Sequence, residues 1–527
     1  MPIYRRLTGL PASLSAVCLA ATLFAFAFPG FACDQVPAGD TFRVRLVQPI
    51  SSYSSKKGSV VRAMMIESPE CGHQPIFPTG TRIEGRVVNV RRIGLGFRHE
   101  TAALELEFDE IQPAGAPPIA MRARLLDVDN AREHVRKGVI RGIRSINSPQ
   151  NHLSSRVGYL LTWHPDTILI LPAYHALFPV LPEPELHFPS GTDLLLTLAA
   201  PLDVTSLPAP PSFDAGFAAT EQADLDSMAV SFPERTTTPK GQNADVVNLA
   251  FVGSPMQLAD AFQAAGWKRG EPMSTRAVLQ EIHAFVMEGN NAQGPMSKQL
   301  LDGDPADSTY EKGLNSLAKR DHLRIWNSDA TWKGEPIWLS ASTRDVNANF
   351  SVRKVKLVHY IDPNVDHERE RIVRDLSLAG CVDGVENVDR PAMPHSGFNG
   401  AGTKIETDGA IAVVRLKDCE NPIFRSDPET PALAVGPSGL KRYIRTQVLA
   451  SRDLWRENLF YDGFNATRAS VRAIRRRRAA EQALRRTVAT TAQSESDLSV
   501  ESDASTAAEN PIPDFSELPM LTGIARP

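Results

Sequence analysis

Two short stretches in the second half of the chain carry side chains that can do chemistry. In the first, His322 and Arg324 alternate with apolar residues, and Asp345 follows further along. The second contains His359 and Asp362. Two imidazoles and a carboxylate can bind a divalent metal and, with an open coordination position, support hydrolysis. The same groups can instead hold a phosphate or a carboxylate, because a guanidinium binds both as a fork.

Each of these residues also has a structural explanation. His322 can hydrogen-bond a backbone carbonyl on a buried strand, and Arg324 can stack on a neighbouring tryptophan. Asp362 stands directly before Pro363, as an N-cap residue stands before a proline at the first helical position. Three alternatives therefore remain: a structural cluster, an anion-binding site and a metal site. The candidate metal ligands are His322, His359 and Asp345.

No motif in the sequence names a reaction or a cofactor. There is no glycine-rich phosphate loop, no Gly-x-Ser-x-Gly elbow and no His-Glu-x-x-His pair, so the cofactor is unknown. The net charge of −4 does not suggest bulk nucleic-acid binding. The apolar stretch 159–181 contains His164, Asp166 and Pro172, which favours a buried strand and loop over a membrane span.

The elements that would position the candidate residues mix strands with helices. Residues 246–252 form an apolar strand, after which Ser254 fits an N-cap and Pro255 the first helical position. This mixture favours an α+β domain over residues 246–420. Further strands are expected at 322–326, 336–342, 352–361 and 410–416, and further helices from 274 and 363.

The alternation within residues 322–326 predicts which side chains share a face. His322, Arg324 and Trp326 would lie on one face of the strand, and Leu323 and Ile325 on the other, toward the core. If the strand 352–361 is a neighbour, its polar residues would converge on the first of these faces.

The same region contains a set of short motifs: the entry strand 248–254, Ala265-Gly-Trp267, His322-x-Arg-x-Trp326, Trp338-Leu339, His359-x-Ile-Asp-Pro363 and Asp366-x-Glu-Arg369. With these motifs the region resembles the LssY-like C-terminal domain family. Residues 298–319 depart from the family pattern. The resemblance implies association with the cell envelope and supplies no activity.

Residues 33–206 are predicted to form an all-β module. Period-two alternation occurs at 42–47, 82–88 and 103–108, and Pro-x-Gly turns precede strands at 77–81 and 188–192. Short strands with such turns favour a small barrel or sandwich. Residues 40–110 also resemble the β-barrel region of TrbI-like conjugation and envelope-channel proteins, which implies an envelope-facing module and no activity.

The first 32 residues fit a cleavable secretory signal. Arg5 and Arg6 form a basic start, residues 13–28 are almost wholly apolar, and Ala32 is a small residue at the cleavage point. Cleavage there would leave Cys33 first, which allows lipoprotein anchoring as the less favoured alternative to plain export. We therefore expect a protein of the periplasm or cell envelope.

Four cysteines remain after cleavage, and an even number in an exported chain favours disulfides. Three connectivities are possible, and local pairing of Cys33 with Cys71 and of Cys381 with Cys419 keeps each bridge in one domain. A lipid on Cys33 would exclude the first bridge. A zinc site is the alternative, although no Cys-x-x-Cys spacing supports it.

Three further segments complete the predicted organisation. Residues 207–245 are rich in proline and are read as a linker. Residues 421–490 are read as a helical arm ending in an Arg-rich segment, and residues 491–527 as a disordered acidic tail.

The Arg-rich segment has two readings. It can be a solvated helix face, or it can contact anionic lipid headgroups or another acidic surface. The candidate membrane or anion contacts are Arg475, Arg476, Arg477 and Arg478.

The function predicted from these features is a non-enzymatic binding or structural protein of the cell envelope. Its partners would be envelope components or anionic lipid headgroups. The alternative is a hydrolase, metal-dependent or acting on a phosphate or lipid, with the His322, Arg324, Asp345, His359 and Asp362 cluster as its site.

Overall fold

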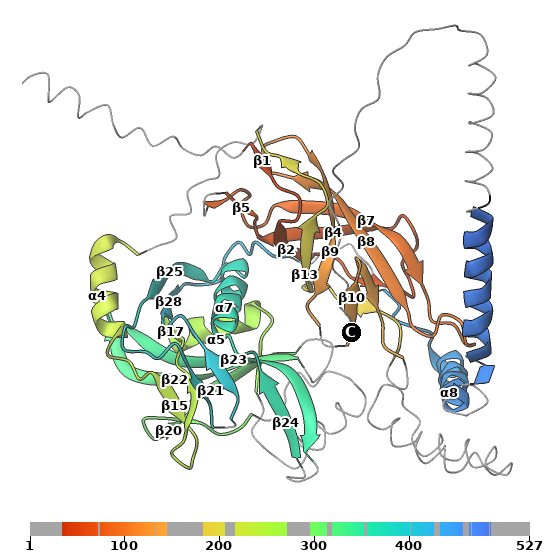
Figure 1. Ribbon diagram of the computed structural model, residues 1–527. Coiled ribbons are helices and arrows are strands. Elements are labelled where there is room, and N and C mark those ends of the chain that lie inside the picture. Colours follow the sequence, from red (N-terminus) through yellow and green to blue (C-terminus); the bar gives the residue numbers. More distant parts are fainter. Residues whose placement is uncertain are drawn as a thin grey trace, which may run out of the picture. The chain divides into compact units, whose positions relative to one another are not determined.

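The computed structural model describes residues 34–71, 74–130, 132–144, 183–205, 217–270, 296–313, 319–351, 356–400, 402–425, 433–456, 463–464, 466–483 and 485 (Figure 1). The chain divides into two compact units, Met1–Leu454 and Trp455–Pro527. Several predicted features lie outside the described residues: the signal sequence, Cys33, the apolar stretch 159–181, the helix from 274 and the acidic tail.

Six strands of the N-terminal half close into an antiparallel barrel, called here the β module. The strand order is β8-β7-β4-β2-β13-β9, and a further pairing of β8 with β9 closes the ring. A hairpin of β10 (His134–Arg136) and β11 (Val139–Arg141) extends it beside β8. The barrel strands are β2 (Thr41–Leu46), β4 (Val60–Glu67), β7 (Arg82–Arg91), β8 (Ala103–Gln112), β9 (Ile119–Val128) and β13 (Asp193–Leu198).

Three two-stranded pairs accompany the barrel. They join β1 (Gln35–Val36) to β14 (Leu202–Asp203), β3 (Ile50–Ser51) to β12 (His187–Phe188), and β5 (Glu70–Cys71) to β6 (Gln74–Pro75).

Alternation and turn chemistry explain the barrel. Leu104, Leu106 and Phe108 of β8 are buried in its core, as their spacing predicted. The two Pro-x-Gly turns have Gly80 at φ +94° and Gly191 at φ +90°, a backbone conformation that side chains with a Cβ rarely adopt. The prediction of a β-barrel-like N-terminal module is therefore confirmed.

The second domain is built on one large mixed sheet. Its strand order is β18-β21-β22-β23-β17-β28-β25, with β24 paired to β23 and a single parallel pair, β17 with β28, among the described strands. The strands are β17 (Leu249–Val252), β18 (Lys268–Arg269), β21 (Ser308–Gly313), β22 (Arg320–Trp332), β23 (Glu335–Ser351), β24 (Lys356–Ile361), β25 (Val382–Val388) and β28 (Ile411–Leu416).

One face of this sheet is covered by two helices, α5 (Pro255–Ala264) and α7 (Asp366–Leu378). Ser254 caps α5, and its hydroxyl accepts a hydrogen bond from the Gln257 amide at 3.2 Å, as the sequence predicted. Phe262 of α5 and Ile372 of α7 pack with strand residues such as Phe251 in this layer. The α+β character of the domain is thereby confirmed.

The opposite face of the sheet is also covered, which the sequence did not predict. Helix α4 (Ala219–Ala229) packs Leu225 and Ala229 against it. A small sheet of order β16-β15-β19-β20 lies over the neighbouring part and contributes Leu301. Its strands are β15 (Arg235–Thr237), β16 (Asn243–Val246), β19 (Leu300–Leu301) and β20 (Asp304–Pro305); a separate hairpin joins β26 (Ser396–Phe398) to β27 (Lys404–Glu406).

The predicted linker 207–245 is therefore wrong from residue 219 onward. Pro239 belongs to the hairpin turn between β15 and β16, where the Thr238 amide donates to the Gln242 carbonyl at 2.8 Å. Proline in a tight turn gives the same local composition as proline in a linker, so composition alone could not separate the two.

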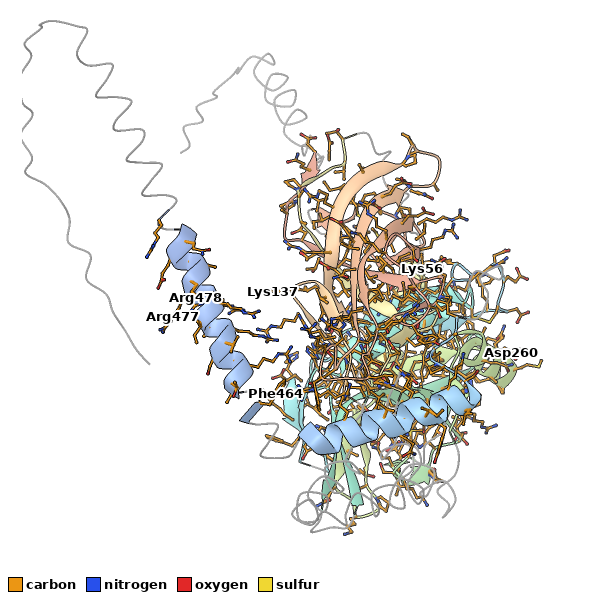
Figure 2. All side chains as sticks on the ribbon, turned by 90° about the vertical axis from the view of Figure 1, so that its right-hand side faces the viewer. Lys56, Lys137, Asp260, Phe464, Arg477 and Arg478 are labelled. Atoms are coloured by element: carbon orange, nitrogen blue, oxygen red, sulfur yellow. A yellow bond between two sulfur atoms is a disulfide. The ribbon has the colours of Figure 1, made fainter. Side chains whose placement is uncertain are left out.

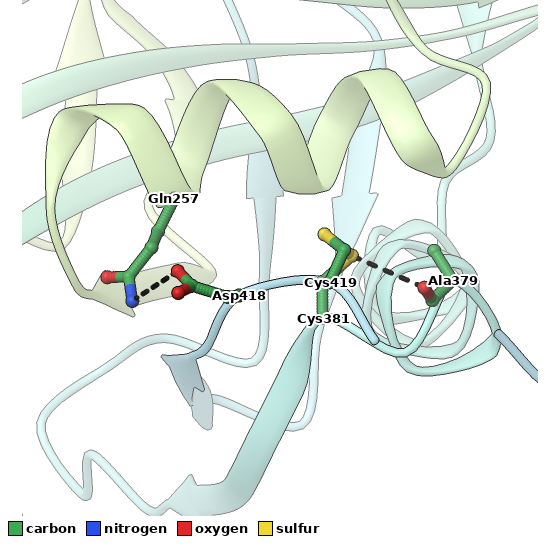
Figure 3. Close-up of a disulfide and its surroundings, with 5 residues drawn as sticks. All are labelled: Gln257, Ala379, Cys381, Asp418 and Cys419. Carbon is green, nitrogen blue, oxygen red and sulfur yellow. Dashed lines mark hydrogen bonds between the residues drawn. A yellow bond between two sulfur atoms is a disulfide. The ribbon is translucent and has the colours of Figure 1, made fainter. Parts of the chain in front are cut away.

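A disulfide joins Cys381 to Cys419 with a Cα–Cα distance of 4.1 Å (Figure 3). It ties the chain just after α7 to the chain just after β28. Cys381 is fully buried, and its Sγ lies 3.5 Å from the Ala379 carbonyl oxygen. This predicted pairing is confirmed. Cys71 lies in β5, but Cys33 is outside the described residues, so the other pairing stays a prediction.

The predicted arm contains two helical segments, α8 (Gly439–Arg456) and residues 466–483. The second segment holds the four candidate contact arginines, and the side chain of each is exposed: Arg475, Arg476, Arg477 and Arg478. Their exposure agrees with both readings of the Arg-rich segment, so contact with an anionic surface stays a prediction. Over the part of the chain that is described, no helix has both the length and the apolarity that a membrane crossing requires.

Candidate functional site

His322 lies on β22 with its side chain buried between the large sheet and the small one. Its Nε2 is 2.9 Å from the Thr343 hydroxyl on β23, and its Nδ1 is 3.9 Å from Oδ2 of Asp345. Burial lowers the pKa of His322 to about 4, although the Asp345 carboxylate opposes this; Arg324 lowers it further. The imidazole is therefore neutral at physiological pH.

The guanidinium of Arg324 donates hydrogen bonds to residues of its own domain. Its Nη1 donates to Oδ2 of Asp245 on β16 at 3.3 Å, and its Nε and Nη2 donate to the Ser297 carbonyl at 3.2 and 3.0 Å. Asp245 is held in turn by Gln299, whose Nε2 donates to the same oxygen at 2.5 Å. Burial lowers the pKa of Arg324, and Asp245 opposes that effect.

The predicted alternation on β22 is present, but it does not open a site. Leu323 and Ile325 pack under α5 and α7, and Trp326 packs on the other face. That second face is closed by the small sheet that includes Asp245. Neither His322 nor Arg324 lines the cavities of about 340, 400 and 580 Å³ found over the described residues.

The strand register separates His359 from His322. On β23, Thr343 pairs with His322, whereas Ala348 pairs with His359 on β24. Asp345 pairs with both β22 and β24, so these strands lie on opposite sides of β23. From strand spacing and rise, the two histidine backbones are roughly 15–20 Å apart. The register therefore does not bring the two imidazoles to one metal ion; the His359 side chain itself is outside the described part.

Asp362 forms a turn before α7 rather than its cap. Its Oδ1 accepts from the Asn364 amide at 3.0 Å, and its Oδ2 lies 3.2 Å from Nδ1 of the exposed His367. The helix begins only at Asp366, because the Glu406 amide donates to the Pro363 carbonyl and ties residues 363–364 to β27. The prediction that Asp362 is the N-cap is wrong.

Among the five candidates, His322, Arg324 and Asp345 interact with one another, and the register separates His359 from His322. Asp362 follows Ile361, the register partner of Asp345, but its carboxylate contacts Asn364 and His367. Among the described residues, no group of three His, Cys, Asp or Glu side chains is arranged to hold a metal ion.

The densest set of charged groups is one that the sequence did not reveal. It lies at the buried contact between the β module and the second domain, called here the junction. Arg45 of β2 donates from Nε to Oδ1 of Asp193 at 2.6 Å and from Nη2 to Oδ1 of Asp375 on α7 at 2.8 Å. Lys312 and the Trp267 indole hold the other Asp375 oxygen at 2.7 and 3.2 Å.

Opposing effects set the ionisation of this first group. Burial alone would lower the pKa of Arg45, but the carboxylates of Asp193 and Asp375 raise it above its usual value. Burial alone would raise the pKa of Asp375, but Lys312 and Arg45 lower it far below the usual range. Both groups are charged throughout the physiological pH range.

A second group surrounds Asp129, at the end of β9. Its carboxylate pairs with Arg344 of β23 and Arg371 of α7, and Lys319 lies 3.7 Å away. Although burial opposes it, Arg371 and Arg344 lower the pKa of Asp129. Arg371 also lies 3.5 Å from Asp193, so one helix residue contacts two carboxylates of the barrel.

Two buried carboxyl groups meet behind these arginines. Asp321 lies 3.2 Å from Nε of Arg344, and Glu368 of α7 is 1 % exposed. Burial raises the pKa of Glu368 well above its usual value, and the charge of Asp321 adds to the rise, against the effects of Arg371 and Arg344. Glu368 is therefore harder to ionise than an exposed glutamate.

Apolar side chains seal the junction beside the charges. Met64 and Ile66 of β4 pack with Leu378 of α7, and Val47 and Phe424 pack against them. Two cavities border the junction. The cavity of about 400 Å³ is lined by Arg43, Arg344, Arg371 and Arg374 among others, and that of about 580 Å³ by Arg45, Asp129, Lys312 and Asp375 among others.

Comparison with known proteins gives three findings. Residues 229–411 match the LssY C-terminus family. No curated protein sequence matches the chain. Among solved structures, ComB10 of the Com type IV secretion system of Helicobacter pylori aligns with 32 % of this chain and 89 % of its own length, at 11 % identity and a TM-score of 0.19. The TrbI-like resemblance stays a prediction.

The matched range contains α5, α7 and most of the large sheet, and it begins within the segment that was read as a linker. The range also includes Asp321, which directly precedes His322, and the charged helix α7. Both belong to the junction. Residues 229–411 of this chain are therefore similar to the LssY C-terminus family.

Proposed function

We propose that this chain is an exported, non-enzymatic protein of the cell envelope, in which the β module and the LssY-like domain act as one scaffold for envelope components. The observation that carries the proposal is the pairing of Arg45 with Asp375 and of Arg371 with Asp129 across the junction. Charged groups that pair with each other across the junction are not available to act on a substrate.

The junction favours one body over two hinged ones. Domains in one chain move relative to each other unless their contact is large and apolar or specifically fixed. Here Met64 and Leu378 provide an apolar seal, and buried ion pairs fix the register beside it. A partner removed from such a pair would leave an uncompensated buried charge, so the two domains fit together only in the arrangement that matches these charges.

The Cys381–Cys419 disulfide supports export. Disulfides persist in oxidising compartments and are rare in the cytosol. A bridge that closes on a fully buried Cys381 agrees with the apolar leader at residues 13–28.

The first test asks whether the two domains unfold together. The mature chain, residues 33–527, is examined by calorimetry, and a single transition that moves down in Asp375→Asn is expected. Two separate transitions, both unmoved by Asp375→Asn, would refute a single scaffold.

The second test addresses the hydrolase alternative and the location. The same protein is assayed for bound metal and for hydrolysis of model esters and phosphomonoesters, with His322→Gln compared with His395→Gln, an exposed histidine whose ring contacts the Thr407 carbonyl. We expect no activity that depends on His322. Stoichiometric zinc or manganese with hydrolysis lost only in His322→Gln would overturn the proposal, as would recovery of the uncleaved chain in the cytosol.

A further inference from the structure

Helix α8 has two faces of opposite character. Its inner face is fixed to the β module: Arg445 donates to Glu183 at 2.7 Å and to Glu185 at 2.8 Å, and Arg452 donates to the Gly94 carbonyl at 2.7 Å. Leu449 between them is 2 % exposed. Because these contacts hold one side of the helix, the direction of its other side is set as well.

The outer face of α8 carries an apolar stripe in solvent. Leu440 is 72 % exposed, Tyr443 and Ile444 are each 52 % exposed, and Val448 is 38 % exposed. Their spacing places Leu440, Tyr443 and Ile444 on the side of the helix away from Arg445, and Val448 at the border between the two faces. A contiguous row of large apolar side chains that is left in water is a feature of interaction surfaces.

Lysine and arginine are frequent in the part of the sequence that contains this stripe. Lys441 and Arg442 are exposed on α8 itself. Residues 439–486 contain thirteen Lys or Arg and four Asp or Glu, whereas the whole chain has a net charge of −4. The cationic region is therefore a local property of the C-terminal helices and is offset elsewhere in the chain.

The helical segment 466–483 repeats the same combination. Its apolar residues Val471 and Ile474 are exposed, with Phe464 exposed just before the segment. Figure 2 shows Phe464 near the start of this helix and Arg477 and Arg478 further along it. Two successive helical segments thus present apolar side chains among cations, which in the second segment are the exposed Arg475, Arg476, Arg477 and Arg478.

These features match the chemistry of an anionic lipid surface. An amphipathic helix that lies in a membrane interface buries its apolar stripe among the headgroups, while flanking Lys and Arg side chains extend to the lipid phosphates. The cations of α8 and of 466–483 each supply charge complementarity along a helix.

We propose that the outer face of α8, defined by Leu440, Tyr443, Ile444 and Val448, docks on the surface of an anionic membrane and that the arginines of 466–483 reinforce this contact. The proposal deepens, and rests on, the proposed envelope role. Helix α8, which Arg445 fixes to the β module, would then orient the scaffold on the membrane.

Vesicle flotation of the full mature chain tests the proposal. Vesicles of phosphatidylcholine with phosphatidylglycerol are compared with vesicles of phosphatidylcholine alone. Ile444→Glu is expected to weaken binding to the anionic vesicles about tenfold, since it replaces an apolar side chain that would enter the membrane surface and adds a negative charge that the lipids repel. Met256→Glu is the matched control, because Met256 is a 73 % exposed apolar residue of α5, and it is expected to bind as wild type.

A second variant replaces Arg475, Arg476, Arg477 and Arg478 by Ser. It is expected to bind at least tenfold more weakly and to lose most of its salt dependence. Equal flotation of wild type and Ile444→Glu, or equal binding to neutral and anionic vesicles, would overturn the proposal. So would an Ile444-dependent complex with a purified envelope protein that forms without lipid. Vesicle binding does not enter the calorimetric and hydrolysis tests of the scaffold. A failure of the membrane proposal can therefore be distinguished from a failure of the proposed function.

Discussion

Arg45 and Asp375 are 330 positions apart in the chain, yet Nη2 of the arginine donates to Oδ1 of the carboxylate at 2.8 Å in a nearly solvent-free contact. One oxygen of Asp375 accepts this hydrogen bond from the barrel, and the other accepts from Lys312 and Trp267 of its own domain. A single carboxylate of α7 therefore holds both parts of the junction in register.

Asp375→Asn should lower the free energy of unfolding by about 3–5 kcal/mol, because it leaves Arg45 and Lys312 buried with one compensating charge fewer. Urea unfolding of the full mature chain measures the loss. The control is Glu84→Gln in the pair with Arg62, whose side chains are 37 % and 50 % exposed, and there the change should be about 0–1 kcal/mol. Equal losses for the two variants would show that the junction pair is not a buried, coupled contact.

Acid should remove the stability that the ionised carboxylates of the junction contribute. Despite their burial, Asp375 and Asp129 have a lowered pKa in the folded state because of Lys312, Arg45, Arg371 and Arg344. A carboxyl group with a depressed folded pKa stabilises the fold above its unfolded pKa of about 3.9 and loses that effect as the pH falls through the folded value. Stability should therefore fall steeply below about pH 4, and less steeply in Asp375→Asn. A flat acid limb in wild type would contradict the ionised state of these groups.

Glu368→Gln should stabilise the protein at neutral pH. Burial and Asp321 raise the pKa of Glu368, so its ionisation costs folding energy that grows as the pH rises above the unfolded value of about 4.3. The amide has no such cost, and the gain should vanish near pH 4. Thermal unfolding across this range measures it. Glu370→Gln is the control, since that side chain is 61 % exposed, and it should change little at any pH. A destabilised Glu368→Gln would mean that Glu368 acts as a carboxylate.

Local signals predicted the elements well. The alternation around Leu104, the Pro-x-Gly turns at Gly80 and Gly191, and the Ser254 cap all rest on contacts within a few residues, and each is present. The disulfide within the second domain was also predicted correctly, since Cys381 and Cys419 join as expected.

The site could not be predicted, because it depends on what covers each face. Alternation places Arg45 outside the barrel, where a charged residue normally meets water, but α7 covers it. The same limit affected Arg324, whose face is closed by the small sheet containing Asp245. Helix α7 offered one signal in retrospect: acidic and basic residues are interspersed along it, and Asp366, Arg369, Arg371 and Asp375 are all buried, which a solvated helix does not require.

His322 should make the protein less stable in mild acid. Burial lowers its pKa to about 4 in the fold, whereas an unfolded histidine titrates near pH 6.5, so the unfolded state takes up a proton first as the pH falls. Stability should decline between these values with a slope of up to about 1.4 kcal/mol per pH unit and should be unaffected above about pH 7. His322→Gln should flatten this slope in urea unfolding, and His367→Gln, whose side chain is 63 % exposed, should keep it. An unchanged slope in His322→Gln would indicate a solvated, charged imidazole.

The disulfide should contribute stability chiefly through the unfolded chain. Cys381 and Cys419 are separated by 38 positions, and a closed loop of that length is worth about 4 kcal/mol in the chain-entropy account. Replacing both by Ala should lower the free energy of unfolding by that order while leaving α7 in place, because Ile372 and Leu376 still pack under the sheet. Urea unfolding of wild type, with and without reductant, brackets the effect. An oxidised wild type that unfolds at the same urea concentration as the double variant would mean that the bridge is not formed in the exported protein, and the argument for an oxidising compartment would lose its support.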